Sequence, residues 1–235
     1  MIGIEKHFKI CYNSLKKVDE TMKYNTYLFD FDGTLVDSMP LFASLMLRIL
    51  DENNVKYDND IIKVITPLGY AGTAKYFAEH FNIQKSREEL LATMNKYAYD
   101  GYAHTVPAKE NVISTLEELK RRGAELYILT ASPHSVLDVC LKRLEIFDLF
   151  NGVWSCDDFG TTKADPEIYK MAAERIGKPI EEVLFLDDNY NADKTAKSAN
   201  MQVCGVYDLS SEEYVEEIKR VSDHYVYDFK ELLDL

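Results

Sequence analysis

The sequence lacks the patterns that mark secreted, zinc-binding and membrane-spanning proteins. Its 235 residues include four cysteines, and no two of them form a Cys-x-x-Cys pair. Isolated cysteines of this kind indicate reduced, mostly buried thiols in a cytoplasmic protein, not a disulfide framework or a zinc site. No uninterrupted apolar run reaches the ~20 residues that a membrane-spanning helix needs. Residues 1–22 lack the apolar middle of a signal peptide, and we expect them to form an N-terminal extension.

Positive charge is also scarce. The chain has 27 lysines and arginines against 40 aspartates and glutamates, which gives a net charge of -13. An acidic surface repels phosphate backbones and anionic lipid heads, so we expect neither nucleic acid nor a membrane as a partner. A phosphorylated ligand would have to be met by a few local lysines and a cation. The 46% of hydrophobic and 29% of charged residues are typical of a globular chain with a real core.

The first part of the chain predicts one strand followed by helices. Residues 24–31 form a short apolar and aromatic run that ends in acid and glycine, which is typical of a buried strand entering a loop. From about residue 38 to residue 105, apolar residues recur at helical spacing, and Ser86 with Glu89 forms a capping box. This stretch is therefore predicted to be all-helical.

After Pro107 the pattern alternates between helices and strands. Strands are predicted at residues 125–130, near Val153, at 183–187 and at 202–207, and Ser132 is predicted to cap the helix after the first of these. Such alternation favours a parallel sheet with helices on both faces. The predicted fold class is α/β, a doubly wound, Rossmann-like core over residues 23–39 and 105–235. A helical cap domain over residues 40–104 would interrupt it.

Polar residues follow three of the predicted strands: Asp30 and Asp32, Thr130, and Asp187 and Asp188. In open α/β sheets, ligands bind beyond the carboxyl ends of the strands, so these groups should converge at one edge. Four carboxylates there would repel one another, and a divalent cation together with Lys163 would offset that repulsion. Oxygen ligands without histidine or cysteine select a hard cation, and Mg²⁺ suits carboxylates combined with phosphate oxygens.

The first of these strand ends differs from an ordinary turn. Alternation places Asp30 and Asp32 on the same side of an extended chain, and Gly33 lets the backbone approach a phosphate closely. Other acids are expected only to cap helices or form turns: Asp37, Asp165 and Asp193.

Four segments in this order resemble the motifs of the haloacid dehalogenase superfamily. They are YLFDFDGTLVDS, ILTAS, Lys163 and LFLDD, and the similarity covers about residues 24 to 232. Within the superfamily the chain is similar to the branch of phosphoglycolate phosphatases and beta-phosphoglucomutases, with the helical insert in the place of their cap.

The resemblance implies covalent catalysis. Asp30 would attack phosphorus and form an aspartyl-phosphate, and Asp32 would serve as general acid and then base. Mg²⁺ would be held by the Asp30 carboxylate, the Asp32 backbone carbonyl and Asp188, with support from Asp187.

The phosphoryl group would have its own contacts in such a site. The resemblance implies that these come from Gly33, Thr34, Thr130, Ala131 and Lys163. The expected activity is the hydrolysis of a small phosphorylated metabolite, similar to phosphoglycolate or a sugar phosphate.

The sequence also departs from the family pattern. Ala164 follows Lys163 where the family often has proline, so this loop could be looser. Asp187 precedes Asp188 where a glycine is common, which leaves open which of the two binds the metal directly.

Three alternatives to a phosphatase follow from the same residues. Asp32 argues against a dehalogenase, which has no oxygen leaving group to protonate. A sugar-phosphate mutase would keep both acids, but it tends to have a histidine where this chain has Phe42 and a residue other than threonine at Thr34. A catalytically silent phosphate-binding module is disfavoured because all four motifs are intact.

Substrate choice is expected to come from the cap. The candidates near its helix starts are Phe42, Arg48, Tyr70 and Lys75. We expect the protein to be a monomer or a weak homodimer.

Overall fold

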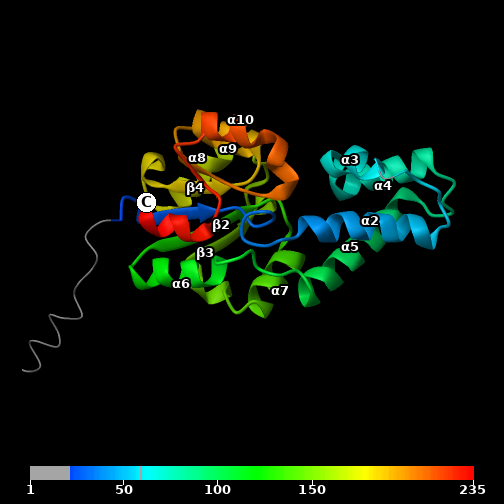
Figure 1. Cartoon of the computed structure of the whole chain (residues 1–235), viewed down its shortest axis with the longest axis horizontal. Coiled ribbons are helices and arrows are strands. Elements are labelled where there is room, and N and C mark those ends of the chain that lie inside the picture. The colour runs from blue at the N-terminus through cyan, green and yellow to red at the C-terminus, as the bar shows by residue number, and fades with distance from the viewer. Residues whose placement is uncertain (1–21, 59) are drawn as a thin grey trace, which may run out of the picture.

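The computed structural model describes residues 22–58 and 60–235, so the expected N-terminal extension lies outside the described residues except for Met22. A six-stranded sheet forms the centre, in the order β3-β2-β1-β4-β5-β6, and every neighbouring pair is parallel. Helices cover both faces, and a helical region extends from one side (Figure 1). The predicted fold class is therefore confirmed.

The strands are β1 (Thr26–Phe29), β2 (Glu125–Thr130), β3 (Gly152–Ser155), β4 (Leu184–Asp187), β5 (Gln202–Val206) and β6 (His224–Val226). The first five lie where the sequence predicts strands. The sixth has only three residues and was not predicted. Strand β1 pairs with β2 on one side and with β4 on the other, although both neighbours come much later in the chain.

The α-helices are α2 (Met39–Glu52), α3 (Ile61–Ile65), α4 (Gly69–His80), α5 (Arg87–His104), α6 (Val112–Arg121), α7 (His134–Arg143), α8 (Glu167–Ile176), α9 (Tyr190–Ser198) and α10 (Val215–Val221). Short 3-10 helices lie at η1 (Thr66–Leu68), η2 (Phe147–Leu149), η3 (Cys156–Phe159), η4 (Ile180–Glu182), η5 (Leu209–Tyr214) and η6 (Phe229–Asp234). Among the described residues, none of these helices is long and apolar enough to cross a membrane.

Alternation along β1 divides the core into two layers. Tyr27 and Phe29 point to one face, where apolar side chains of α6, α7 and η6 cover them. Leu28 points to the other face, toward α8 and α9. All four residues of β1 are buried, which explains why Tyr27, Leu28 and Phe29 are apolar or aromatic on both faces of the strand.

Helices α2–α5, which we call the helical cap, have a separate hydrophobic cluster that includes Met46, Phe77 and Met94. The predicted helical character of this stretch is confirmed. The capping box is confirmed as well, because the Glu89 amide donates to Ser86 Oγ at 3.1 Å and the Ser86 amide donates to Glu89 Oε2 at 2.7 Å. Near the core, a Cβ on Gly101 would overlap the side chain of Leu41, so α5 and α2 pack closely there.

Candidate active site

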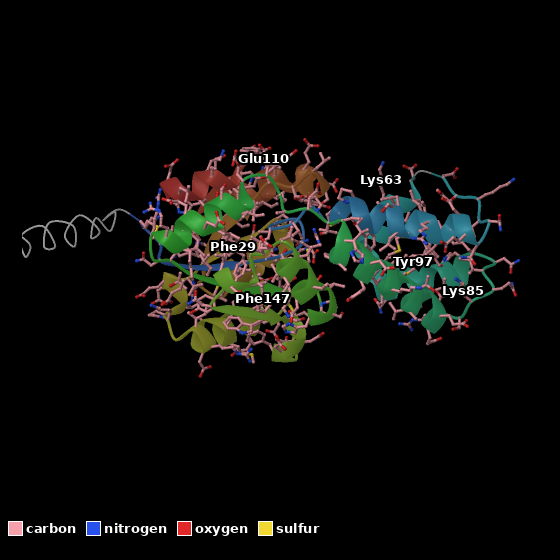
Figure 2. All side chains as sticks on the ribbon, turned by 90° about the horizontal axis from the view of Figure 1, so that it is seen from below. Phe29, Lys63, Lys85, Tyr97, Glu110 and Phe147 are labelled. Carbon is pink, nitrogen blue, oxygen red and sulfur yellow. The ribbon has the colours of Figure 1, made fainter. Side chains whose placement is uncertain are left out.

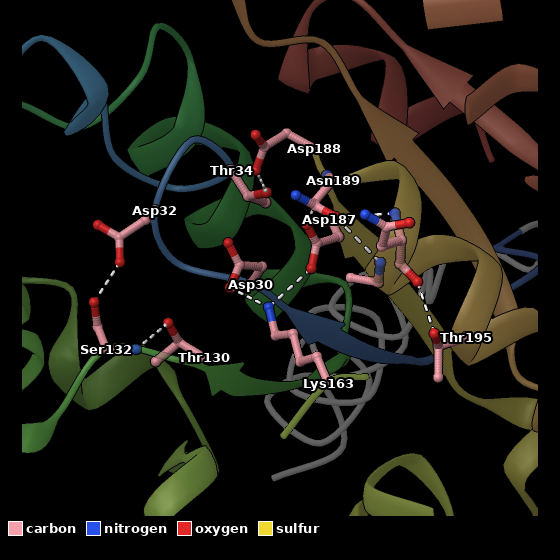
Figure 3. Close-up of polar contacts among 12 residues, drawn as sticks. Asp30, Asp32, Thr34, Thr130, Ser132, Lys163, Asp187, Asp188, Asn189 and Thr195 are labelled. Carbon is pink, nitrogen blue, oxygen red and sulfur yellow. Dashed lines mark hydrogen bonds and ion pairs between the residues drawn. The ribbon is translucent and has the colours of Figure 1, made fainter. Parts of the chain in front are cut away.

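The carboxyl ends of the central strands bring the predicted acids together. Asp30 directly follows β1, and its amide donates to the Leu186 carbonyl of β4 at 2.8 Å. This bond places Asp30 beside Asp187, the last residue of β4 (Figure 3). Thr130 ends the neighbouring strand β2, so three strands contribute to one edge of the sheet.

Three buried carboxylates form a cluster at this edge. Asp30, Asp187 and Asp188 each offer one oxygen, and these oxygens all lie within 4.8 Å of one another. Lys163 lies between two of them, with Nζ donating to Asp30 Oδ1 and, at 2.8 Å, to Asp187 Oδ2 (Figure 3). Three of the four carboxylates that the sequence predicts to converge therefore lie in one cluster with Lys163, whereas Asp32 is not part of it.

One lysine does not balance this much buried negative charge. Burial raises the pKa of Asp30 to about 7, with Asp187 and Asp32 adding to the effect and Lys163 opposing it. Burial, Asp187 and Asp30 also raise the pKa of Asp188 well above its ordinary value. Burial disfavours the charged form of Lys163, but Asp187 and Asp30 raise its pKa well above normal. A cluster of hard oxygen ligands that protonates for lack of positive charge fits a divalent cation such as Mg²⁺.

The loop after β1 approaches Asp188 closely. Gly33 has a φ of +79°, and a Cβ on it would lie 2.7 Å from the Asp188 carboxylate. Both observations require glycine, because other residues rarely adopt this backbone conformation. Thr34 Oγ1 donates to Asp188 Oδ1 at 3.3 Å. Two of the five residues predicted to contact phosphate, Gly33 and Thr34, thus lie directly against Asp188.

Asp187 and Asp188 differ in their remaining acceptor capacity. Asp187 Oδ2 accepts from Lys163, and its Oδ1 accepts from the Asn189 amide at 2.8 Å. Asp188 accepts only the long bond from Thr34 among the hydrogen bonds of the described residues. Asp188 therefore keeps more free lone pairs for a metal.

The carboxylate of Asp32 points away from Lys163 and toward Ser132 (Figure 3). It accepts from Ser38 Oγ at 2.7 Å and Tyr102 OH at 2.5 Å on Oδ1, and from Ser132 Oγ at 2.5 Å on Oδ2. The prediction that Ser132 caps the following helix is wrong, because Pro133 holds the N-cap position of α7. The Ser132 amide instead donates to Thr130 Oγ1 at 3.1 Å, and Ala131 between them is exposed.

Asp193 was expected to cap a helix or form a turn, and this prediction is wrong. Asn189 caps α9 by accepting from two amides, whereas Asp193 is fully buried and its Oδ1 has no partner among the described residues. Burial, Asp187 and Asp188 raise the pKa of Asp193 well above its ordinary value. Asp193 lies three residues before Ala196 and therefore on the same inward face of α9. This spacing was the feature of the sequence that could have indicated burial of Asp193. Asp165 does form the expected turn, since its Oδ1 accepts from the Glu167 amide at 2.9 Å.

Lys109 is a further residue that the sequence did not single out. Its Nζ donates to the Gly33 carbonyl at 2.5 Å, to the Tyr207 carbonyl at 2.6 Å and to Asp208 Oδ2 at 2.9 Å. It therefore ties the loop that carries Asp32 to the end of β5. A lysine in a connecting loop gives no sequence signal for such a role.

The charged cap candidates make their ion pairs within the cap. Arg48 Nε donates to Glu52 at 2.8 Å, Lys75 lies 3.9 Å from Glu79, and both basic side chains are 59% exposed.

The aromatic candidates, Phe42 and Tyr70, lie with ring centroids 5.4 Å apart. Tyr70 packs against both the core cluster and the cap cluster, so it lies at the boundary between cap and core.

Comparison with known proteins agrees with this geometry. The family model of haloacid dehalogenase-like hydrolases matches residues 27–206. A curated relative, pyrophosphatase PpaX of Bacillus cereus (strain AH820), is 29% identical over 203 residues, which cover 84% of this chain and 90% of the relative.

Solved structures show the same fold. A candidate beta-phosphoglucomutase from Thermotoga maritima has a TM-score of 0.76 at 23% identity and covers 89% of this chain and 97% of its own. A predicted phosphoglycolate phosphatase from Haemophilus somnus also has a TM-score of 0.76, at 22% identity. The match covers 92% of this chain and 98% of that protein. The resemblance inferred from the four motifs is confirmed, and because the family model matches most of the chain, this protein belongs to the haloacid dehalogenase-like hydrolases.

Proposed function

We propose that this hydrolase is a magnesium-dependent phosphatase that releases phosphate from a small phosphorylated metabolite through an aspartyl-phosphate on Asp30. The observation that carries the proposal is the buried cluster of Asp30, Asp187 and Asp188 around Lys163. One carboxylate oxygen of Asp30 remains available to attack phosphorus, because Lys163 engages only the other.

The cation would be held by Asp30, Asp188 and the backbone carbonyl of Asp32. Asp188 is the better direct ligand, since both oxygens of Asp187 already accept hydrogen bonds. When bound, Mg²⁺ would supply positive charge to the phosphoryl oxygens and to the carboxylate that they approach.

The reaction would proceed in two displacements. Asp30 attacks phosphorus, the bond from phosphorus to the ester oxygen breaks, and Asp32 gives its proton to that oxygen. Water then attacks the aspartyl-phosphate, Asp32 takes a proton from it, and Asp30 and phosphate are released. Lys163 would neutralise charge on the phosphoryl oxygens.

Neutral groups would complete the phosphate site. We assign these contacts to Gly33, Thr34, Thr130 and Ala131, which lie around the acids. Thr130 and Ala131 are followed by Ser132, whose hydroxyl reaches Asp32, so phosphate bound by this loop would lie near the acid.

The substrate would be enclosed by the cap (residues 40–104). Closure of such a cap over the core excludes water from the reaction. The cap contributes the aromatic pair Phe42 and Tyr70, of which Tyr70 packs against the core, whereas Arg48 and Lys75 make ion pairs with Glu52 and Glu79. This favours a sugar-phosphate-like substrate with hydroxyl groups over phosphoglycolate, whose carboxylate needs a cation.

Pyrophosphate is a second candidate substrate, because the relative described above is named a pyrophosphatase. Its second phosphate would need positive charge beyond Lys163. A mutase would return the phosphoryl group to a sugar instead of releasing it, so measuring free phosphate distinguishes these reactions.

The test is a screen of phosphorylated metabolites and pyrophosphate, with Mg²⁺ or with EDTA, for the wild type and Asp30→Asn. We expect Mg²⁺-dependent release of phosphate and a loss of at least ~1,000-fold in Asp30→Asn, which should fold normally. Asp32→Asn should also fail and could retain phosphate on Asp30. Normal turnover by Asp30→Asn would exclude Asp30 as nucleophile, and a folded wild type without any turnover would favour the silent module.

We further propose a cytoplasmic enzyme that is a monomer or a weak homodimer and binds neither nucleic acid nor membrane. Its three described cysteines, Cys140, Cys156 and Cys204, are buried and free, which suits a reducing compartment. Sedimentation at several protein concentrations would measure the oligomeric state.

A further inference from the structure

The acid that must exchange protons with substrate is held by an unusual set of hydroxyl groups. Both carboxylate oxygens of Asp32 accept hydrogen bonds, from Ser38 and Tyr102 on Oδ1 and from Ser132 on Oδ2. These donors come from the linker before α2, from the end of α5 and from the loop after β2. We propose that Tyr102 is a positioning residue that fixes this carboxylate and directs its proton to Oδ2. The inference rests on the proposed phosphatase function.

Tyr102 belongs to a cap helix but is anchored to the core. Its backbone carbonyl accepts from Arg143 Nε of α7 at 3.0 Å, and the same arginine donates to the Val106 carbonyl. The Tyr102 ring stacks on Phe31, with centroids 5.9 Å apart and an interplanar angle of 27°. Phe31 is the residue between the two catalytic acids. These contacts anchor the phenol to the core.

The three hydroxyl groups are not equivalent as donors. A serine hydroxyl can rotate and accept a hydrogen bond, so Ser132 can remain bonded to Asp32 when the carboxyl carries a proton. Tyr102 is only 5% exposed, and a phenolic hydroxyl stays protonated at neutral pH. The phenol therefore keeps its proton, and its short bond to Oδ1 orients this proton toward the carboxylate.

The bonding pattern determines which oxygen can act as the acid. Oδ1 accepts two hydrogen bonds, one of them from a phenol that remains a donor. A proton on Asp32 is therefore accommodated on Oδ2, which faces Ser132 in the loop that follows β2 (Figure 3). The proton would pass from Oδ2 to the leaving oxygen, and the same oxygen would accept a proton from water in the second step.

The test is Tyr102→Phe, which keeps the ring on Phe31 and removes only the hydroxyl. The matched control is Tyr97→Phe on the same helix, because Tyr97 OH also donates to a carboxylate, that of Glu52, at 2.7 and 2.9 Å. Tyr97 lies within the helical region, five residues before Tyr102 on α5 (Figure 2). Turnover is measured on an alkyl phosphate and on 4-nitrophenyl phosphate, whose leaving group departs without needing a proton.

We expect Tyr102→Phe to lower kcat/KM for the alkyl phosphate ~10- to 100-fold, the range for a lost hydrogen bond to a charged group. The loss on 4-nitrophenyl phosphate should be clearly smaller, and Tyr97→Phe should match the wild type on both. In an Asp32→Asn background, Tyr102→Phe should cause no further loss, since it acts only through Asp32. Ser38→Ala removes the other donor to Oδ1 and should show the same dependence on the leaving group. It replaces Tyr102→Phe as the test variant if Tyr102→Phe is unfolded at the assay temperature.

Several results would overturn the inference. They are an unchanged or higher kcat/KM in Tyr102→Phe, equal losses on both esters, and a further loss in the Asp32→Asn background. A wild type that releases phosphate from no ester would overturn the proposed function itself and this inference with it. An active wild type with an unaffected Tyr102→Phe would overturn only the role of Tyr102.

Discussion

Raising the pH without a divalent cation should destabilise this protein. The pKa of Asp30 is about 7 in the folded chain against an ordinary 3.8, so the folded state binds a proton that the unfolded state has lost. A raised carboxyl pKa contributes stability that is complete below the ordinary value and is lost as the pH rises through about 7. Asp188 and Asp193 are shifted in the same direction and add to the effect.

The magnitude follows from the same shift. Between pH 5 and pH 8, the folded and unfolded states differ by one proton on Asp30 over about two pH units. At about 1.4 kcal/mol per unit, this lowers the free energy of unfolding by ~3 kcal/mol. On the proposed function, Mg²⁺ would bind the ionised cluster of the folded state, so a saturating concentration should restore the stability at pH 8 and have little effect at pH 5.

The assay is urea unfolding in EDTA and in Mg²⁺, at several pH values from 5 to 8. Asp30→Asn is the control, because it removes this titration and leaves that of the histidines. Two histidines with shifted pKa values remain in the control: His134, whose pKa is raised by bonds to Asp138 and Asp158, and His224, whose pKa is lowered by burial. The reasoning would be refuted if the free energy of unfolding in EDTA did not change with pH. It would also be refuted if this free energy fell with pH as steeply in Asp30→Asn as in the wild type.

Three further substitutions separate the site from the cap. Lys163→Met should reduce phosphate release at least ~100-fold, because the phosphoryl charge and two buried carboxylates lose their cation, and retention of most turnover would contradict this role. Gly33→Ala should raise the Mg²⁺ concentration for half-maximal activity and lower stability by ~1–3 kcal/mol, since its Cβ would displace Asp188; an unchanged Mg²⁺ titration would count against the close approach. Ser86→Ala should lower stability by ~1 kcal/mol through the lost capping box and leave kcat/KM unchanged, and a loss of turnover would link this end of α5 to the site.

The sheet and the acid cluster could be predicted because their signals are local. Strand β1 is buried on both faces and is apolar or aromatic from residue 27 to residue 29, and Asp30 and Asp32 follow it directly. Parallel pairing then brings Asp187 and Asp188 to the same edge without any knowledge of side-chain contacts.

Other features depend on contacts between distant segments. Tyr102 donates to a residue 70 positions earlier, yet in the sequence it is one more aromatic residue on a helical face. Lys109 reaches three groups from a loop, and Asp193 is buried by packing of α9. Strand β6 has three residues, too few to establish an alternating pattern.

The position of β1 in the sheet has a consequence for synthesis on the ribosome. The strand is made early, but its two partners, β2 and β4, begin at residues 125 and 184, so Asp30 waits unpaired while most of the chain is translated. The helical cap lies between β1 and β2 in sequence and has a hydrophobic cluster made only of its own residues, so it can fold before β2 and β4 are made. Asp30, the proposed nucleophile, can join Lys163, Asp187 and Asp188 in one cluster only after residue 188 has emerged. A nascent chain arrested before that point would carry a folded cap on a core without a reaction centre.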